Sequence, residues 1–274
     1  MILVNGTRSG EVSATDRGLA YGDGIFRTFP ARRGRALHWA RQFAKLAHDC
    51  TALGILPPAA DALERDVVTA CEGERDCAVK IIVTRGPARR GYGYGGGDAP
   101  TRIVSSEALG AHAAAHAESG VSVRLCTLRL SHQPALAGLK HLNRLENVIA
   151  RSEWSDPAIA EGILLDLDER VIGGTMTNIF VVRDGIVMTP PLNRCGVAGV
   201  TRDRVIEAAR ALSLPCCVRA LSWADVLDSE EVFLVNSLAG VWPVRALDGR
   251  ERDPGRVTRC IQRALYEEDD AQAA

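Results

Sequence analysis

Unbroken runs of apolar and β-branched residues limit the folds open to this chain more than any other feature. The clearest run covers residues 78–84, Ala-Val-Lys-Ile-Ile-Val-Thr. A short run of this kind is typical of a strand that is buried within a sheet. Residues 40–53 instead place Phe43, Leu46 and Cys50 at helical spacing, which predicts an amphipathic helix. A chain that alternates such segments is expected to fold as packed layers of helices and sheets.

The same periodicities give an expected order of elements along the whole chain. Strands are predicted at residues 1–4, 25–30, 36–39, 78–84, 102–105, 121–130, 162–167, 179–182, 186–189 and 231–235, and helices at 40–53, 59–71, 143–154, 202–212 and 257–267. Residues 108–120 are rich in Ala and His and are expected to connect two domains. We therefore predict an α/β (α+β) fold with a smaller domain at residues 1–114 and a larger domain at 115–274.

Composition excludes several classes of protein. Of the 274 residues, 46% are hydrophobic and 24% are charged, which suits a chain with a packed core. The formal net charge of −1 gives no electrostatic reason to expect nucleic acid or an anionic membrane as a partner. No apolar run approaches the roughly 18 residues that a membrane-spanning helix needs, and the first residues lack the features of a signal peptide. A cytoplasmic protein is expected.

The eight cysteines do not form a recognisable metal or disulfide pattern. They include no Cys-x-x-Cys pair, and the chain is too long to depend on a disulfide scaffold. We expect free thiols in a reducing compartment, and no metal site.

Lysine is rare in this chain, which uses arginine for most of its basic charge. The lysines are Lys45, Lys80 and Lys140. A lysine amine can form a Schiff base with a carbonyl compound, and it can act as a base once it loses its proton. Lys140 lies at a predicted junction between a strand and a helix. Considered without its neighbours, it is one of three candidates.

The sequence around Lys140 makes it the strongest candidate. The segment Ala-Gly-Leu-Lys-His-Leu-Asn-Arg-Leu-Glu-Asn at residues 137–147 resembles the Schiff-base segment of aminodeoxychorismate lyases. These enzymes belong to the class IV aminotransferase-like, fold type IV family, which uses pyridoxal phosphate. Four further segments resemble the family in the family's order, at residues 21–28, 85–92, 196–202 and 236–244. The resemblance therefore covers nearly the whole chain.

The resemblance implies a fold, an assembly and a cofactor. The fold would be the two-domain architecture of D-amino-acid aminotransferase, with the lysine in the larger C-terminal domain, the site at the domain interface, and a homodimer as the assembly. Lys140 would hold pyridoxal 5'-phosphate, and the phosphate would lie against Val200, Thr201 and Ser237, with Asn178 also in the cofactor site. A helix start just after residue 199 suits a phosphate because its N–H groups and dipole favour an anion.

The resemblance also implies a reaction, the conversion of 4-amino-4-deoxychorismate to 4-aminobenzoate and pyruvate in folate synthesis. Lys140 would serve as the base, and the hydroxyl of Thr28 would assist proton transfer to the departing fragment. Arg90, Tyr92 and Tyr21 would contact the substrate, with Arg90 binding a carboxylate through charge-assisted hydrogen bonds. Without the resemblance, Thr28 would be read as a strand residue, and the loop that carries Arg90 and Tyr92 as a solvated connection.

Two positions depart from the family pattern. Lys45 stands where the first long helix of the family commonly has an arginine that binds the phosphate, so the charge is kept but the two-pronged guanidinium is lost. Gly173 stands where the family usually has a glutamate beside the pyridine nitrogen, which predicts a weaker electron sink. Two alternatives therefore stay open. One is a D-amino-acid or branched-chain aminotransferase of the same fold, and the other is a catalytically silent homologue that binds the cofactor.

Overall fold

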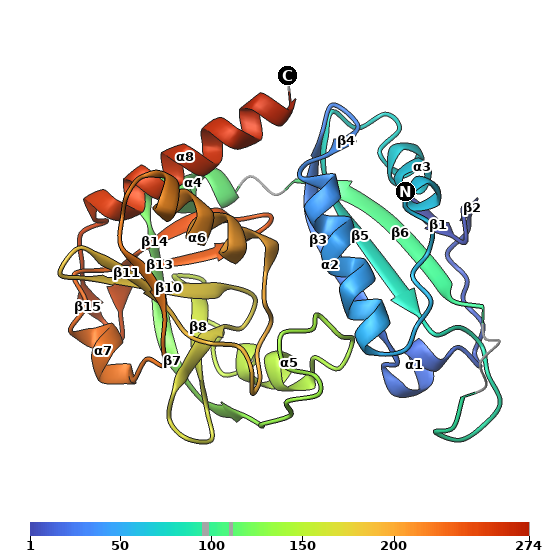
Figure 1. Ribbon diagram of the computed structural model, residues 1–274, viewed down its shortest axis with the longest axis horizontal. Helices are drawn as coiled ribbons and strands as arrows, with labels where there is room; N and C mark the ends of the chain where they lie inside the picture. Colours follow the sequence, from blue (N-terminus) through green and yellow to red (C-terminus); the bar gives the residue numbers. More distant parts are fainter. Residues whose placement is uncertain (95–98, 110–111, 274) are drawn as a thin grey trace. The chain divides into compact units, whose positions relative to one another are not determined.

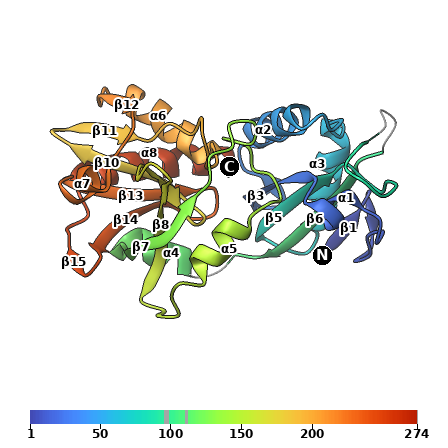
Figure 2. The ribbon, with the colours of Figure 1, turned by 90° about the horizontal axis from the view of Figure 1, so that it is seen from below.

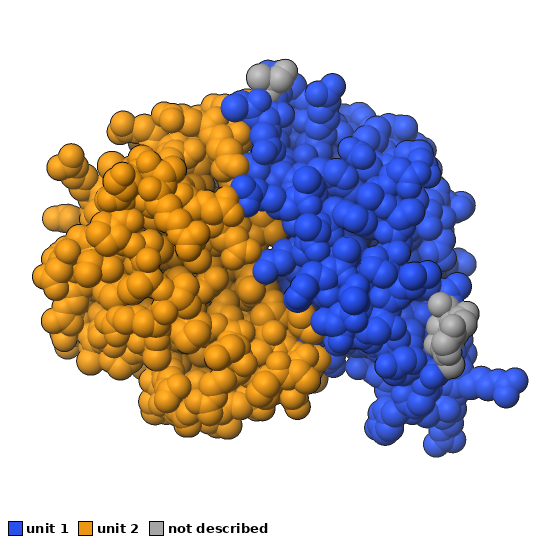
Figure 3. All heavy atoms as spheres, in the orientation of Figure 1, with its two compact units in different colours: residues 1–110, 140–143, 271–274 blue, residues 111–139, 144–270 orange. Residues whose placement is uncertain are grey.

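The computed structural model describes residues 1–94, 99–109 and 112–273, and the chain forms two compact units (Figure 3). Unit 1 comprises Met1–Gly110, Lys140–Asn143 and Ala271–Ala274, and unit 2 comprises Ala111–Leu139 and Arg144–Asp270. Each unit is a mixed α and β structure with its own sheet and its own hydrophobic core. Among the described helices, none has the length and apolar character needed to cross a membrane.

Unit 1 is built on a six-stranded antiparallel sheet in the order β2-β1-β6-β5-β3-β4 (Figure 1). Its elements are β1 (Ile2–Val4), β2 (Thr7–Arg8), α1 (Arg17–Tyr21), β3 (Gly24–Arg32), β4 (Arg35–Ala36), α2 (Trp39–Ala52), α3 (Ala60–Ala70), β5 (Asp76–Thr84) and β6 (Thr101–Ala108). The hairpin between β3 and β4 turns at Arg33 and Gly34, both of which have positive φ angles. Two such residues are characteristic of a tight hairpin turn.

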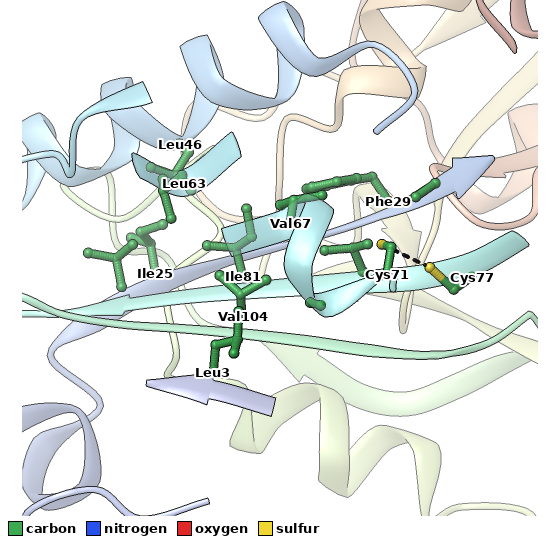
Figure 4. Close-up of a cluster of buried hydrophobic side chains, with 14 of the residues drawn as sticks. Leu3, Ile25, Phe29, Leu46, Leu63, Val67, Cys71, Cys77, Ile81 and Val104 are labelled. Atoms are coloured by element: carbon green, nitrogen blue, oxygen red, sulfur yellow. Dashed lines mark hydrogen bonds between the residues drawn. The ribbon is translucent and has the colours of Figure 1, made fainter. Parts of the chain in front are cut away.

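Helices α2 and α3 cover one face of this sheet and enclose the core of unit 1. Figure 4 shows Ile25 of β3 close to Leu46 of α2 and Leu63 of α3, and Phe29 of β3 close to Val67 of α3. Side chains alternate between the two faces of a strand, so residues 26, 28 and 30 of β3 lie on the opposite face. Those positions are only partly buried, whereas Ile25 and Phe29 are fully buried. The sheet of unit 1 therefore has one helix-covered face and one face that is open to other contacts.

A short segment from the second half of the chain joins the edge of β3. The N–H of Phe26 donates to the carbonyl of Lys140 at 2.9 Å, and the N–H of Leu142 donates to the carbonyl of Gly24 at 2.9 Å. His141 lies opposite Ile25 in an antiparallel bridge. The expectation that the lysine belongs to the C-terminal domain is therefore wrong. Residues 140–143 are part of unit 1 because their backbone extends its sheet.

Unit 2 is built on a curled nine-stranded sheet in the order β12-β11-β10-β13-β14-β7-β8-β9, with β15 paired to β14. Its elements are α4 (His112–Ser119), β7 (Val121–Leu130), α5 (Leu145–Arg151), β8 (Ile159–Asp166), β9 (Val171–Gly174), β10 (Asn178–Arg183), β11 (Ile186–Thr189), α6 (Val200–Ala211), β12 (Cys216–Val218), α7 (Trp223–Leu227), β13 (Glu231–Asn236), β14 (Gly240–Leu247), β15 (Arg250–Glu251) and most of α8 (Arg256–Ala273).

The central strands of unit 2 are buried on both faces. Phe180 of β10 stacks on Phe233 of β13 with ring centroids 5.0 Å apart, and the pair shares a core with Val205 of α6 and Ile261 of α8. Figure 2 shows both helices near β10 and β13. The alternate residues Ile179 and Val181 point to the other side of the strand and belong to a separate core that includes α7. Burial on both faces explains why residues 179–182 contain no polar side chain.

Most of the predicted elements are present, with shifted ends. The helix predicted at 202–212 begins at Val200, because Gly199 is the extended residue before its first turn. The helix predicted at 143–154 covers only Leu145–Arg151, and the expected connection at 108–120 contains α4. Residues 240–247 form β14, a strand that was not predicted. Pairing with β13 and β7 holds this segment as a strand, which its local sequence does not indicate.

The stacked phenylalanine pair should contribute strongly to stability. We expect Phe233→Ala to lower the free energy of unfolding by about 3–5 kcal/mol, because the substitution leaves a cavity in a fully buried core. Tyr266→Ala on the exposed side of α8 is the control and should change stability by no more than about 0.5 kcal/mol. Denaturant unfolding of the two variants measures both values. Equal stabilities would show that the pair is not a major contact.

Candidate active site

The side chain of Lys140 points to the open face of the unit 1 sheet. Its position opposite Phe26 of β3 places both side chains on the same face. The Nζ atom of Lys140 accordingly lies 4.6 Å from the centre of the Phe26 ring. This is the face that α2 and α3 do not cover, so the amine is directed away from the core of unit 1.

Two further polar residues project from the same face. Thr28 follows Phe26 by two positions on β3, and Lys80 of β5 lies opposite Thr28. The Nζ atom of Lys80 is 5.4 Å from the centre of the Phe26 ring, so this ring has an ammonium group of each lysine near it. The structure thus brings together the predicted pair, Lys140 and Thr28, and adds Lys80, to which the sequence assigned no role.

A buried ion pair lies behind Lys140, on the helix-covered side. Arg27 of β3 and Asp49 of α2 form an ion pair, and their side chains are only 3% and 1% exposed. The same Asp49 oxygen, Oδ2, also accepts a hydrogen bond from the backbone N–H of Lys140 at 3.0 Å. Neither Arg27 nor Asp49 was predicted as a site residue. The available signal was a charged residue at an inward position of an apolar strand, between Ile25 and Phe29.

Lys45 lies on α2, one helical turn before Asp49. Its backbone carbonyl accepts a hydrogen bond from Arg27 Nη2 at 3.3 Å, and its side chain is partly buried. Nothing in these contacts tests the expected role of the Lys45 side chain at a phosphate, which remains a prediction.

The loop that carries Arg90 and Tyr92 is anchored by Arg17 and Tyr21 of α1. The guanidinium of Arg17 donates to the carbonyls of Gly91 at 2.8 Å and Tyr92 at 3.0 Å. The hydroxyl of Tyr21 accepts from the N–H of Gly91 at 3.2 Å, and the Tyr21 and Tyr92 rings are 5.4 Å apart. Arg90 is exposed, and Tyr92 is 85% exposed. The structure therefore holds the backbone of this loop and leaves its predicted substrate-binding side chains in solvent.

Asp23 links this loop to the end of β5. Its carboxylate accepts hydrogen bonds from Arg17 Nε at 2.7 Å and from Arg85 Nε at 2.8 Å. Burial raises the pKa of the Asp23 carboxyl, but the hydrogen bonds and charges of Arg85 and Arg17 outweigh it and hold the pKa below its usual range. The Arg85 guanidinium also lies 3.7 Å from the centre of the Tyr94 ring. Asp23 is thus ionised at neutral pH and fixes both arginines.

In unit 2, the predicted phosphate-binding residues gather at the start of α6. The residue before the helix is Gly199, which has no side chain to accept hydrogen bonds from the first-turn N–H groups of Val200 and Thr201. The hydroxyl of Thr201 lies 3.4 Å from the hydroxyl of Ser237, in the turn after β13. N–H groups at a helix start without a side-chain cap, together with two hydroxyls, form a suitable arrangement for a phosphate group.

Asn178 fixes the shape of this turn. Its amide group donates to the carbonyl of Val197 at 2.8 Å and accepts from the N–H of Gly199 at 3.3 Å. A Cβ atom on Gly199 would lie 2.5 Å from Asn178 Oδ1, so a side chain there would displace the Asn178 amide. Asn178, predicted as a cofactor residue, therefore supports the backbone beside Val200. The structure brings together the four predicted residues of unit 2.

The turn after Gly173 contains no acid at the position where the family commonly has one. A fully buried carboxylate, that of Glu161 on β8, contacts this turn. It accepts hydrogen bonds from the N–H and hydroxyl of Thr175, the N–H of Met176 at 3.0 Å and the hydroxyl of Thr177 at 3.0 Å. These donors occupy its lone pairs. Glu161 therefore orders the turn and is not available as a substitute for the missing glutamate.

Comparison with known proteins agrees with this geometry. Residues 24–247 match the model of the amino-transferase class IV family. The chain is 35% identical over 266 residues to the aminodeoxychorismate lyase of Vibrio harveyi, covering 96% of this chain and 98% of that protein. It is 26% identical over 270 residues to the branched-chain-amino-acid aminotransferase of Escherichia coli, covering 93% and 87%.

Solved structures give the same result. The 4-amino-4-deoxychorismate lyase of Pseudomonas aeruginosa superposes with a TM-score of 0.93 at 43% identity, covering 97% of this chain and 98% of that chain. A hypothetical aminotransferase of Mycobacterium tuberculosis, in its PLP-bound form, shares the fold with a TM-score of 0.86 at 23% identity and 99% coverage of both chains. The family match, the near-complete coverage and the shared fold lead to one conclusion: this chain belongs to the amino-transferase class IV family.

Proposed function

We propose that this protein is a pyridoxal-phosphate-dependent lyase that converts 4-amino-4-deoxychorismate to 4-aminobenzoate and pyruvate. The observation that carries the proposal is that Lys140 and Thr28 project from the same open face of the unit 1 sheet, in a chain 43% identical to a lyase of this name. The branched-chain aminotransferases are less similar, at 26% identity for the enzyme of Escherichia coli. The aminotransferase alternative is therefore the weaker one.

The residues present suit pyridoxal phosphate at two of its three binding points. Lys140 supplies the amine, and the uncapped start of α6 with Thr201 and Ser237 supplies donors for the phosphate. The third point, an acid for the ring nitrogen, is absent at Gly173. The bound cofactor would supply an electron sink for the reaction.

Within this proposal the side chains divide the work of binding and proton transfer. Lys140 Nζ holds the cofactor and later removes the proton from the carbon that bears the substrate amine. The Thr28 hydroxyl holds a proton for the leaving pyruvate fragment. Arg90 binds a substrate carboxylate, and Tyr92 of the same loop and Tyr21 of α1 also contact the substrate. Loss of the fragment makes the product ring aromatic, which provides driving force that a transaminase lacks.

The product and the thiols suggest where the protein acts. 4-Aminobenzoate is a precursor of folate, so we place the reaction in folate synthesis. All eight cysteines are free, which is compatible with the reducing cytoplasm that we propose as its location.

Release of pyruvate from 4-amino-4-deoxychorismate tests the proposal directly. The protein loaded with pyridoxal phosphate should release pyruvate and 4-aminobenzoate in equal amounts, measured by a coupled dehydrogenase assay and by chromatography. Lys140→Ala should abolish the visible absorbance of the lysine-bound cofactor and lower turnover by about 10³-fold or more, because it removes both the attachment point and the base.

Lys80→Ala is a useful comparison, since it removes an amine from the same face of the sheet. It should leave the visible absorbance intact. A protein that shows this absorbance but releases no pyruvate would be a silent binder or, if it transfers amino groups between branched-chain amino and keto acids, an aminotransferase.

The backbone around Gly173 resists restoration of the missing glutamate. A Cβ atom at Gly173 would lie 2.8 Å from the carbonyl oxygen of Thr177, closer than such atoms approach in folded proteins. We expect Gly173→Glu to destabilise the fold by about 1–3 kcal/mol and to lower the melting temperature. Gly10→Glu, at a position with open space around it, should leave the melting temperature unchanged. Equal melting temperatures for both variants would contradict the close approach.

We propose that the protein forms a homodimer through α5. This helix exposes Leu145, Val148 and Ile149, whose side chains are 73%, 61% and 55% accessible and share one face by their spacing. An apolar helix face of this kind is a common feature of protein interfaces. Helix α5 begins just after residues 140–143, so the proposed interface and the proposed site are neighbours in the sequence.

Val148→Asp should weaken the dimer and leave the fold of each subunit intact. Burial of a carboxylate in an apolar interface should raise the dimer dissociation constant about tenfold or more. Val68→Asp is the matched control, because Val68 is a 52% exposed valine on another helix, α3. Light scattering after size exclusion measures the mass of both variants. If both remain dimers at low concentration, the interface lies elsewhere.

A further inference from the structure

Burial of the Arg27–Asp49 ion pair costs free energy of desolvation, and the attraction between the two charges does not explain why the pair is present. Arg27 lies between the fully buried residues Ile25 and Phe29, and Asp49 is on the buried side of α2. Removing two charges from water is costly, and apolar residues of similar size often stabilise such a position equally well or better. The buried pair therefore indicates a role other than stabilising the fold.

Asp49 connects the pair to the backbone of Lys140. Its Oδ2 atom accepts from Arg27 Nη2 and, at 3.0 Å, from the N–H of Lys140. The carbonyl of Lys140 accepts a hydrogen bond from the N–H of Phe26 at 2.9 Å. Both polar groups of the Lys140 backbone are therefore held, the N–H by a charged group and the carbonyl by the sheet.

This arrangement restrains a side chain that is otherwise flexible. A lysine has a four-carbon stem, and its amine can occupy many positions unless the backbone from which it starts is fixed. Asp49, on α2, accepts the hydrogen bond from the Lys140 N–H. The Lys140 side chain points to the face that carries Phe26 and Thr28. The ion pair with Arg27 in turn holds the carboxylate in place. The chain of contacts thus runs from α2, through Asp49, to the start of the lysine side chain.

We propose that Asp49, held by Arg27, is a positioning residue that fixes the backbone of Lys140 and so sets the reach of its amine. The inference rests on the proposed function, because it is the proposed role of Lys140 that gives its position a chemical consequence. Asp49 does not touch the reacting atoms. Its effect passes through one hydrogen bond.

Two double variants isolate this hydrogen bond. Arg27→Met with Asp49→Asn removes both charges but keeps an acceptor oxygen for the Lys140 N–H. Arg27→Met with Asp49→Leu also removes both charges, and leucine has nearly the shape of asparagine without the acceptor. Neither variant leaves an unpaired buried charge, which avoids the main reason for misfolding. Arg102→Met with Asp66→Leu removes another partly buried ion pair of unit 1 and is the control for a purely structural loss.

Hydrogen exchange of the Lys140 amide is the primary measurement, made on full-length protein without the cofactor. We expect exchange to be about 10- to 100-fold faster in the leucine variant than in the asparagine variant, and unchanged in the Arg102 and Asp66 control. With the cofactor and 4-amino-4-deoxychorismate, kcat should fall about tenfold in the leucine variant, recover substantially in the asparagine variant, and show little change in KM.

The outcomes separate this inference from the proposed function. Equal exchange in the two Asp49 variants would overturn the inference, as would faster exchange with an unchanged kcat. A wild-type protein that releases no pyruvate would overturn the proposed function. In that case the exchange data alone would still decide whether Asp49 anchors the Lys140 backbone, because that measurement needs neither cofactor nor substrate.

Discussion

The pairing of residues 140–142 with the start of β3 is the contact on which the proposed chemistry depends. More than a hundred residues of chain separate the two partners, and closing so long a loop has an entropic cost. Two backbone hydrogen bonds and the Asp49 contact offset part of that cost. The pairing also decides the direction of the lysine, because a shift of one residue would turn its side chain toward the helix-covered core.

The Gly-Asp-Gly motif before β3 has a physical explanation in this pairing. Gly22 has a φ angle of 65°, and a Cβ atom there would lie 2.5 Å from Asn143 Oδ1. A Cβ atom on Gly24 would lie 2.5 Å from the Val83 carbonyl oxygen of β5 and 2.9 Å from the Leu142 side chain. Both glycines therefore make room for the returning lysine segment, and Asp23 between them holds the two arginines of the adjoining loop. A motif identified by resemblance is thus a receiving site for a distant part of the chain.

Sequence periodicity predicted the elements well where burial is simple. Residues 78–84 and 186–189 are strands as expected, since one local pattern decides each. It failed where a distant partner decides the structure, as in β14 and in the assignment of Lys140 to the second domain. The ion pair of Arg27 and Asp49 was missed for the same reason. Arg27 lies at an inward position of its strand, but the local sequence does not indicate its partner, and only the packing of α2 on β3 brings it to Asp49.

The absence of a glutamate at position 173 follows from how the neighbouring turn is built. The carboxylate of Glu161 accepts hydrogen bonds from backbone and hydroxyl donors of residues 175–177, and these bonds fix the turn. The carbonyl of Thr177 then closes over Gly173 and leaves no space for a side chain. The turn is therefore ordered by Glu161, and position 173 carries no acid. In a lyase whose product gains aromatic stability, a weaker electron sink is a smaller loss than it would be in a transaminase, so this turn fits the proposed reaction better than its alternative.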